Sequence, residues 1–299
     1  MPDRESISKR FLSIQDQICR ELEKADGQSS FITDDWQRPG GGGGKSRVLK
    51  NGAVIEKGGV NFSSVYGELP DAIAKEFGVG SKEFFATGVS IVIHPKNPHV
   101  PIVHMNIRYF EMEGDNWWFG GGIDLTPHYV NKKEAKSFHS VLKAVCDKHH
   151  STFYPEFKEW ADRYFFIPHR DETRGVGGIF FDRLNGHKMD LNKEEWAAFV
   201  YDVGESFLPA YLPILEANKN KPFTEDQKQW QLLRRGRYVE FNLVYDRGTH
   251  FGLKTNGRIE SILMSLPKYA SWEYDFKVQE KSPEAETLGL LKKGISWVD

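Results

Sequence analysis

Residues 103–109 read Val-His-Met-Asn-Ile-Arg-Tyr, so apolar side chains alternate there with polar ones. Such alternation predicts a β-strand, which we place at 103–112. Because every second residue of a strand projects to the same side, His104, Asn106 and Arg108 share one face and the apolar residues share the other. An imidazole that can transfer protons, an amide and a fixed cation point to a binding or catalytic face. The alternative is an exposed polar face of an antiparallel sheet.

A second strand is predicted at 88–94, where Ser90 and His94 share a face. The prolines that follow force an irregular link, so the pattern does not decide whether this face meets that of His104. Further strands are predicted at 48–63, 238–245 and 258–266. Helical spacing or capping predicts helices at 7–22, 132–150, 153–166, 193–217 (bent or broken) and 224–235. Strands at both ends of a helical middle favour a single α+β domain over residues 1–299, built on a large antiparallel sheet.

The composition excludes several classes of protein. Across 299 residues, 40 basic side chains are balanced by 42 acidic ones, so neither nucleic acid nor a membrane surface is an expected partner. No apolar run approaches the length of a membrane span. Cys19 and Cys146 fall in helical patterns, which argues against a disulfide framework. Because Met1 to Asp26 lack an apolar signal core, we expect a cytoplasmic protein.

Residues 39–46 read Pro-Gly-Gly-Gly-Gly-Gly-Lys-Ser and are similar to a nucleotide-binding P-loop, but they fail its requirements. Pro39 occupies the position of the first glycine in that motif, and proline has no N–H to donate to a phosphate. Residues 33–38 carry no strand pattern that could precede such a loop. Two alternatives remain, a flexible linker or a glycine loop that serves another site.

Two other glycine-containing segments are candidates for a site. Residues 117–127 place three glycines between an aromatic cluster and Asp124, which would let the backbone approach a flat ligand. A tight turn is the alternative for this segment. Residues 169–182 contain two arginines, and the guanidinium of Arg174 could fork onto a carboxylate. A solvated loop is the alternative there.

Together these segments are similar to the oxygen-dependent coproporphyrinogen III oxidase family. The resemblance rests on Lys158-Glu159-Trp160, on Tyr164-Phe165-Phe166, on the run from His169 to Asp182, and on blocks at 36–48, 88–98, 117–127 and 234–265. The family often has cysteine at the position of Ala161. This chain lacks that cysteine, so its chemistry cannot depend on a thiol there. The resemblance implies a single α+β domain with helices on both faces of the sheet, working as a homodimer. It also implies the oxidative decarboxylation of two propionates of coproporphyrinogen III to vinyls, with O₂ as the electron acceptor, giving protoporphyrinogen IX.

Residue by residue, the resemblance implies that His104 is the proton donor. The substrate contacts that it implies are Ser90, Asn106, Ile107, Arg108, Asn256, Gly257 and Arg258. It places the dimer contact at Tyr238 to Trp272. For the bacterial branch only, it implies a divalent, manganese-like metal whose ligands would be His94, His104, His139 and His169. The spacing of these histidines is not by itself that of a compact metal site.

The chemistry of this substrate adds further candidates. A flexible tetrapyrrole with four carboxylates needs local cations in a protein of balanced charge, and the candidates are Arg108, Arg174 and Arg258. Asp124 is a candidate catalytic carboxylate beside the pyrrole N–H groups. The glycine run could approach the tetrapyrrole, with Lys45 and Arg47 available to its propionates. Two rival functions are a metal-dependent oxygenase with a histidine and carboxylate triad, and a tetrapyrrole-binding protein without activity.

Overall fold

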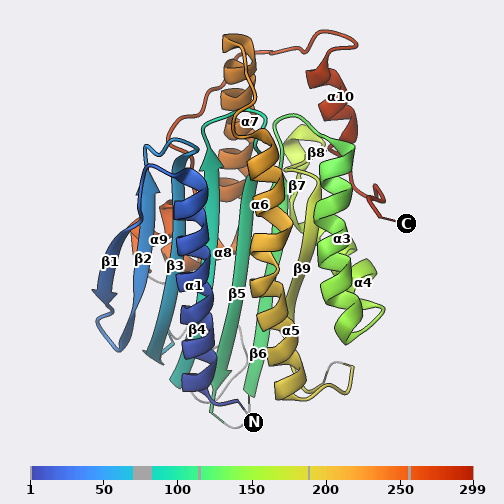
Figure 1. Ribbon diagram of the computed structural model, residues 1–299. Coiled ribbons are helices and arrows are strands. Elements are labelled where there is room, and N and C mark those ends of the chain that lie inside the picture. Colours follow the sequence, from blue (N-terminus) through green and yellow to red (C-terminus); the bar gives the residue numbers. More distant parts are fainter. Residues whose placement is uncertain (1, 70–82, 114–115, 188, 255–256, 299) are drawn as a thin grey trace.

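The structure, a computed structural model, describes residues 2–69, 83–113, 116–187, 189–254 and 257–298. Its centre is an antiparallel sheet (Figure 1). The sheet has seven strands in the order β1 (Ile32–Gln37), β2 (Gly42–Lys50), β3 (Ile55–Glu68), β4 (Glu83–Pro95), β5 (Ile102–Met112), β6 (Asn116–Thr126) and β9 (Gly177–Leu184). A separate ribbon pairs β7 (Phe166–Ile167) with β8 (Glu172–Thr173), and the short helix η1 (Pro168–Arg170) joins them.

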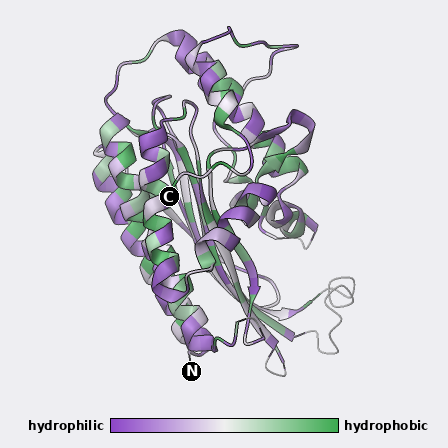
Figure 2. Cartoon of the chain, turned by 90° about the vertical axis from the view of Figure 1, so that its right-hand side faces the viewer, coloured by the Kyte–Doolittle hydropathy of each residue, from purple (hydrophilic) through white to green (hydrophobic). Residues whose placement is uncertain are grey.

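Helices cover both faces of the sheet, as predicted, and Figure 2 shows the sheet between the two helical layers. One face carries α1 (Arg4–Asp26), α3 (Lys132–His149), α5 (Lys193–Glu205) and α6 (Phe207–Asn218). The other carries α7 (Glu225–Val244), α8 (Arg247–Lys254) and α9 (Ile259–Leu263). Two further helices of the described residues are α4 (Phe153–Tyr164), which packs on the edge strand β9, and α10 (Pro283–Leu290). Among the described residues, no helix combines the length and apolarity needed to cross a bilayer.

The apolar face of the sheet forms the core together with the first helical layer. Met105 and Ile123 are fully buried there, in one apolar cluster with Phe11 and Ile14 of α1. Each such side chain contributes roughly 1.5–3 kcal/mol by leaving water. The predicted helix at 7–22 is confirmed as α1, and Gly27 ends it in the left-handed conformation (φ 74°).

Most predicted elements are confirmed, including the strands at 88–94 and 103–112, which lie in β4 and β5. The helices predicted at 132–150 and 153–166 are α3 and α4. The segment 193–217 is broken, as predicted, where α5 ends and α6 begins. The capping box that was predicted at Thr224 and Gln227 is present and begins α7.

Two predicted strands are wrong. Residues 238–245 largely belong to α7, and residues 258–266 contain α9. In α7 the buried residues Tyr238, Phe241 and Asn242 recur at helical spacing, so packing onto the sheet overrides the strand propensity of this apolar segment.

The interpretation of the glycine run as a linker is also wrong. Most of residues 33–38, which carry no strand pattern, form β1, an edge strand that is largely exposed and therefore needs no apolar alternation. Gly40 and Gly41 form the tip of the hairpin that joins it to β2, with φ angles of 104° and 126°. Residues 42–44 already belong to β2. The run therefore connects two strands, whereas a P-loop connects a strand to a helix.

Candidate active site

Strand register brings polar side chains from neighbouring strands onto one face, opposite the apolar core. His104 of β5 lies opposite Asp124 of β6, and Asn106 lies opposite Ser90 of β4. Arg108 follows two residues further along the same face. The predicted polar faces of β4 and β5 therefore meet and form one surface, beneath α7, α8 and α9.

Asp124 joins two of the predicted residues in one hydrogen-bonded cluster. Its carboxylate is 1% exposed and accepts hydrogen bonds from the Arg174 guanidinium at 2.7, 2.9 and 3.2 Å. His104 Nδ1 lies 2.8 Å from Asp124 Oδ1. Burial by itself would raise the pKa of Asp124, but the Arg174 charge and the His104 hydrogen bond outweigh it and hold that pKa below its usual range. An ionised carboxylate only accepts, so His104 Nδ1 carries the hydrogen and Nε2 is left for chemistry.

Arg174 is enclosed by three aromatic rings. Its Cζ lies 4.4 Å from the ring centroid of Phe165, 4.6 Å from that of Phe241 and 4.7 Å from that of Tyr238. The predicted fork onto a carboxylate is present, and that carboxylate is Asp124. Because the guanidinium is buried and already paired, the geometry supports a positioning role for Arg174 instead of contact with a substrate carboxylate.

Arg108, by contrast, is a half-exposed cation on the polar face. Its guanidinium donates to Asn106 Oδ1 at 2.8 Å and lies 2.9 Å from Asp182 Oδ1. Gly120 leaves the space for this arrangement, since a Cβ there would meet Asp182 Oδ1 at 2.5 Å and Arg108 Nε at 2.8 Å. The glycines of residues 117–127 thus lie within a strand beneath bulky side chains, and the tight-turn alternative is wrong.

A second carboxylate, Asp246, lies near His104, and sequence reasoning missed it. Its Oδ1 accepts a hydrogen bond from the Tyr164 hydroxyl at 2.9 Å, and its Oδ2 accepts two from Thr249 at 2.8 Å each. Burial would raise the pKa of Asp246, but these hydrogen bonds and the His104 charge lower it overall. The sequence signal is an aspartate directly after the segment predicted as a strand at 238–245, which is too common a pattern to mark a site.

Arg258 lies beside β1, at the far edge of the polar face from Arg108. It forms an ion pair with Asp34, and its Cζ lies 5.9 Å from the ring centroid of Trp36. Gly257 directly precedes it. Asn256, the remaining residue of that predicted substrate contact, lies outside the described residues.

Three of the predicted contacts lie on the wrong side of the sheet. Ile107 is fully buried in the core, because its side chain points away from those of its two neighbours. Arg47 forms an ion pair at 2.6 Å with Asp16 of α1, and Lys45 shares its face on β2. Neither cation is therefore available to a ligand on the polar face, and Ile107 offers that face no side chain.

The four histidines do not fit a shared metal site, because each is held by separate partners. Those partners are Ser265 for His94, Asp124 for His104, Tyr154 and Val176 for His139, and Glu240 and Tyr245 for His169. Burial lowers the pKa of His139 to about 4, as for a neutral core histidine. Within the described part of the chain, no group of three or more His, Cys, Asp or Glu side chains could hold a metal ion.

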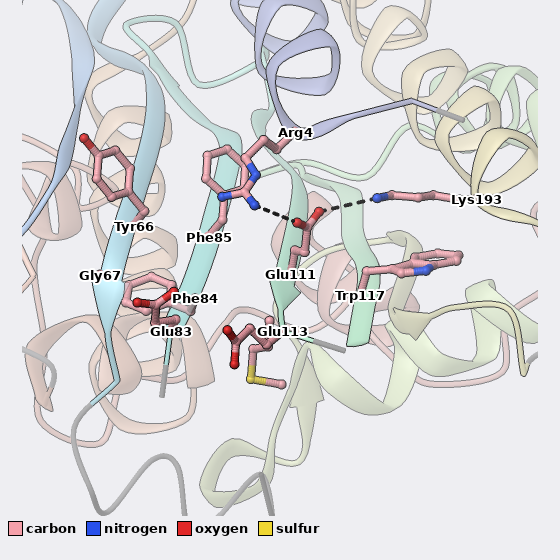
Figure 3. A pocket seen from close by; sticks show the side chains of 11 residues that line it. Arg4, Tyr66, Gly67, Glu83, Phe84, Phe85, Glu111, Glu113, Trp117 and Lys193 are labelled. Carbon is pink, nitrogen blue, oxygen red and sulfur yellow. Dashed lines mark hydrogen bonds and ion pairs between the residues drawn. The ribbon is translucent and has the colours of Figure 1, made fainter. Parts of the chain in front are cut away.

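A pocket of about 500 Å³ lies at the end of the sheet, away from this cluster (Figure 3). Arg4 of α1 and Lys193 of α5 reach Glu111 from two sides, at 3.3 and 3.4 Å. None of the predicted site residues lines this pocket. The presence of a pocket therefore does not by itself identify the site. The hydrogen-bonded cluster of His104, Asp124 and Arg174 on the polar face is the stronger candidate.

This α+β fold, with a histidine oriented by a buried carboxylate and guanidinium, has the arrangement of an enzyme site suited to proton transfer. The chain matches the family described as coproporphyrinogen III oxidase over residues 6–297, and it belongs to that family.

Three curated relatives cover nearly the whole chain. It is 53% identical to the oxygen-dependent coproporphyrinogen-III oxidase of Glycine max, over 99% of this chain and 80% of that protein. It is 52% identical to the enzyme of that name from Nicotiana tabacum, over 95% and 75%. It is 51% identical to coproporphyrinogen-III oxidase 1 of Arabidopsis thaliana, over 98% and 80%. All three are named as chloroplastic, so the prediction of a cytoplasmic protein is contradicted.

Proposed function

We propose that the chain catalyses the oxygen-dependent decarboxylation of two propionates of coproporphyrinogen III to vinyls, giving protoporphyrinogen IX. For each propionate, one O₂ and one proton are consumed, and a vinyl group, CO₂ and H₂O₂ are formed. Two electrons leave the side chain and reduce O₂. The observation that carries the proposal is the His104, Asp124 and Arg174 cluster, in a chain that belongs to this family.

His104 is the residue that we assign to proton transfer. Its Nδ1 is fixed by Asp124, which orients the ring and leaves Nε2 to exchange a proton with the substrate. Asp124 is 1% exposed, so we assign it a positioning role through His104 instead of direct contact with the pyrrole N–H groups. Arg174 keeps Asp124 ionised.

Substrate binding falls to half-exposed groups on the same face. Arg108 is the cation best placed to hold a propionate, since its side chain is 36% exposed. Asn106 lies two residues from His104 on the same face of β5, and Ser90 lies opposite Asn106. Both can contact the pyrrole that reacts. Arg258, with Gly257 before it, would close the site from the β1 side. No step of this proposal is routed through a metal, because the four histidines do not fit a shared one.

A homodimer is part of the same proposal. Of the twelve large apolar side chains that are exposed in the described chain, nine fall between Leu243 and Phe276. This stretch overlaps most of the contact expected at 238–272. Sedimentation should report a dimer that Leu253→Glu dissociates and Phe223→Glu, outside the stretch, leaves intact. A monomeric starting protein would remove this part of the proposal. For the compartment we propose the plastid, which subcellular fractionation would test.

The direct test of the reaction uses purified protein and coproporphyrinogen III, in air and under strict anaerobiosis. Products are oxidised to porphyrins and separated by chromatography with fluorescence detection. We expect protoporphyrin only in the aerobic sample, with H₂O₂ and CO₂ released in equal amounts. Binding of the substrate without any oxygen-dependent product would favour the non-enzymatic alternative, and activity abolished by a chelator would favour the metal-dependent one.

A further inference from the structure

Three aromatic rings form a continuous stack on the polar face, beyond Arg108. The Phe84 and Phe110 centroids are 5.7 Å apart with planes 8° from parallel, and those of Phe110 and Trp118 are 4.4 Å apart at 21°. We call these three residues the aromatic shelf. Each of its rings is half-buried, and Phe84 also lines the pocket of Figure 3.

Register places the aromatic shelf on the same surface as the catalytic cluster. Phe110 follows Arg108 by two residues on β5, which is roughly 7 Å along the strand. Trp118 lies directly opposite Phe110 on β6, two residues before Gly120. Because positions two apart share a face, the surface runs without interruption from His104 to the shelf.

An irregularity in β9 adds a cation to the aromatic shelf. The pairing of β6 with β9 shifts register at this point, and Arg183 has a φ of 53°, a left-handed conformation that non-glycine residues rarely adopt. The consequence is that consecutive residues serve the same face: Asp182 pairs with Arg108, and Arg183 Cζ lies 5.6 Å from the Trp118 ring centroid. A regular strand would send Arg183 to the opposite side.

A second cation lies at the other end of the aromatic shelf. Arg38 Cζ is 5.4 Å from the Phe84 ring centroid, and Arg38 Nη1 donates to Tyr66 O at 2.9 Å. Arg38 belongs to the glycine hairpin between β1 and β2, so that hairpin reaches the polar face at this point. Cross-strand aromatic pairs stabilise many sheets. The guanidinium groups add cation–π contacts to that stability, and they also place a positive charge at each end of the stack, where an anion could bind.

We propose that the aromatic shelf is a second pyrrole subsite for the tetrapyrrole substrate. It holds a ring that is not reacting, while Arg183 binds the propionate of that ring and Arg38 binds the propionate of a neighbouring ring. Arg174 is buried and committed to Asp124, so it is not available to any of the four substrate carboxylates, and cations elsewhere on the polar face are needed. The rings of the shelf pack face to face, so their edges are left for a pyrrole, in the edge-to-face arrangement that aromatic rings favour, and a flanking guanidinium matches the one propionate that this pyrrole carries. This inference rests on the proposed function.

The test is steady-state kinetics of Arg183→Gln and Trp118→Leu with coproporphyrinogen III. We expect KM to rise about tenfold in each, as for loss of one charge-assisted contact, with kcat within about twofold. Arg183→Lys should recover part of the affinity. The matched controls are Arg20→Gln, an exposed arginine on α1, and Phe223→Leu, an exposed ring outside the polar face. Both controls should match the wild type.

Substrate binding to the same variants under nitrogen, where turnover is blocked, should show the same tenfold loss. Because Arg183 is exposed, its substitution preserves the fold and decides the matter even if Trp118→Leu is unstable. An unchanged KM and unchanged binding for Arg183→Gln, in a wild type that is active, would overturn the subsite alone. A wild type without oxygen-dependent activity would instead remove the proposed function.

Discussion

Replacing Arg174 by methionine should destabilise the protein strongly, because it strands the Asp124 carboxylate in the interior. Both side chains are 1% exposed, and three hydrogen bonds join them. Methionine keeps an apolar side chain of similar length among Phe165, Tyr238 and Phe241, so loss of packing is small. Removing one partner of a buried ion pair costs about 3–5 kcal/mol.

For a chain of this size that loss corresponds to a fall in melting temperature of roughly 2 °C per kcal/mol, or about 6–10 °C. The deficit should also depend on pH. Without Arg174, burial raises the folded pKa of Asp124 above its unfolded value. A group of that kind is destabilising once it ionises, so the deficit is full at alkaline pH and shrinks as the pH falls and Asp124 takes up a proton.

Scanning calorimetry of the wild type, Arg174→Met, Asp124→Asn and the double variant gives the coupling between the two side chains. Asp124→Asn removes the carboxylate charge that Arg174→Met leaves unpaired. The double variant should therefore lose clearly less stability than the sum of the two single losses. Additive losses, or an Arg174→Met penalty below about 1 kcal/mol, would refute the reasoning about a buried charge.

Two further predictions concern binding and pH. Arg108→Gln should raise KM for coproporphyrinogen III at least about tenfold, because a charge-assisted contact with a propionate is lost. The KM of Arg108→Lys should lie between those of the wild type and Arg108→Gln. An unchanged KM in Arg108→Gln would exclude Arg108 as a carboxylate ligand. His139 has a folded pKa of about 4, below its unfolded value, so the stability that it contributes is complete above pH 6.5 and is lost as the pH falls toward 4. Between pH 7.5 and pH 5 the loss is about 2 kcal/mol, measured by urea unfolding, and His139→Gln should flatten this dependence; an equal slope in that variant would contradict the assignment.

Local periodicity carries much of the fold in this sequence. Alternation at 103–112 decides which side chains of β5 share a face, and helical spacing identifies α1. Periodicity contains no register, however. That Ser90 meets Asn106 depends on the pairing of β4 with β5 across a proline-rich link, which no local pattern encodes. The same limit explains the apolar segment 238–245, which becomes helical through its packing on the sheet.

The candidate site was predictable in its residue types more than in their roles. His104, Asp124 and Arg174 come from three separate segments, and the sequence marks each as chemically suitable. Burial distinguishes their roles. Asp124 and Arg174 are buried and paired, whereas His104 keeps its Nε2 for the ligand. Asp246 was missed because nothing in its neighbours indicates that the fold brings it close to His104. The aromatic shelf was missed because it depends on the pairing of β4, β5 and β6, and Arg183 joins it only through the irregular register between β6 and β9.

The central claim is that His104 performs proton transfer on the polar face. Its most direct test is the single-turnover rate of His104→Gln with saturating coproporphyrinogen III in air, with substrate affinity measured separately under nitrogen. We predict a loss of rate of about 10²–10⁴-fold with affinity unchanged within about threefold, as expected for removal of a general acid and base. A variant that turns over at nearly the wild-type rate, or that loses rate and affinity equally, would contradict the claim.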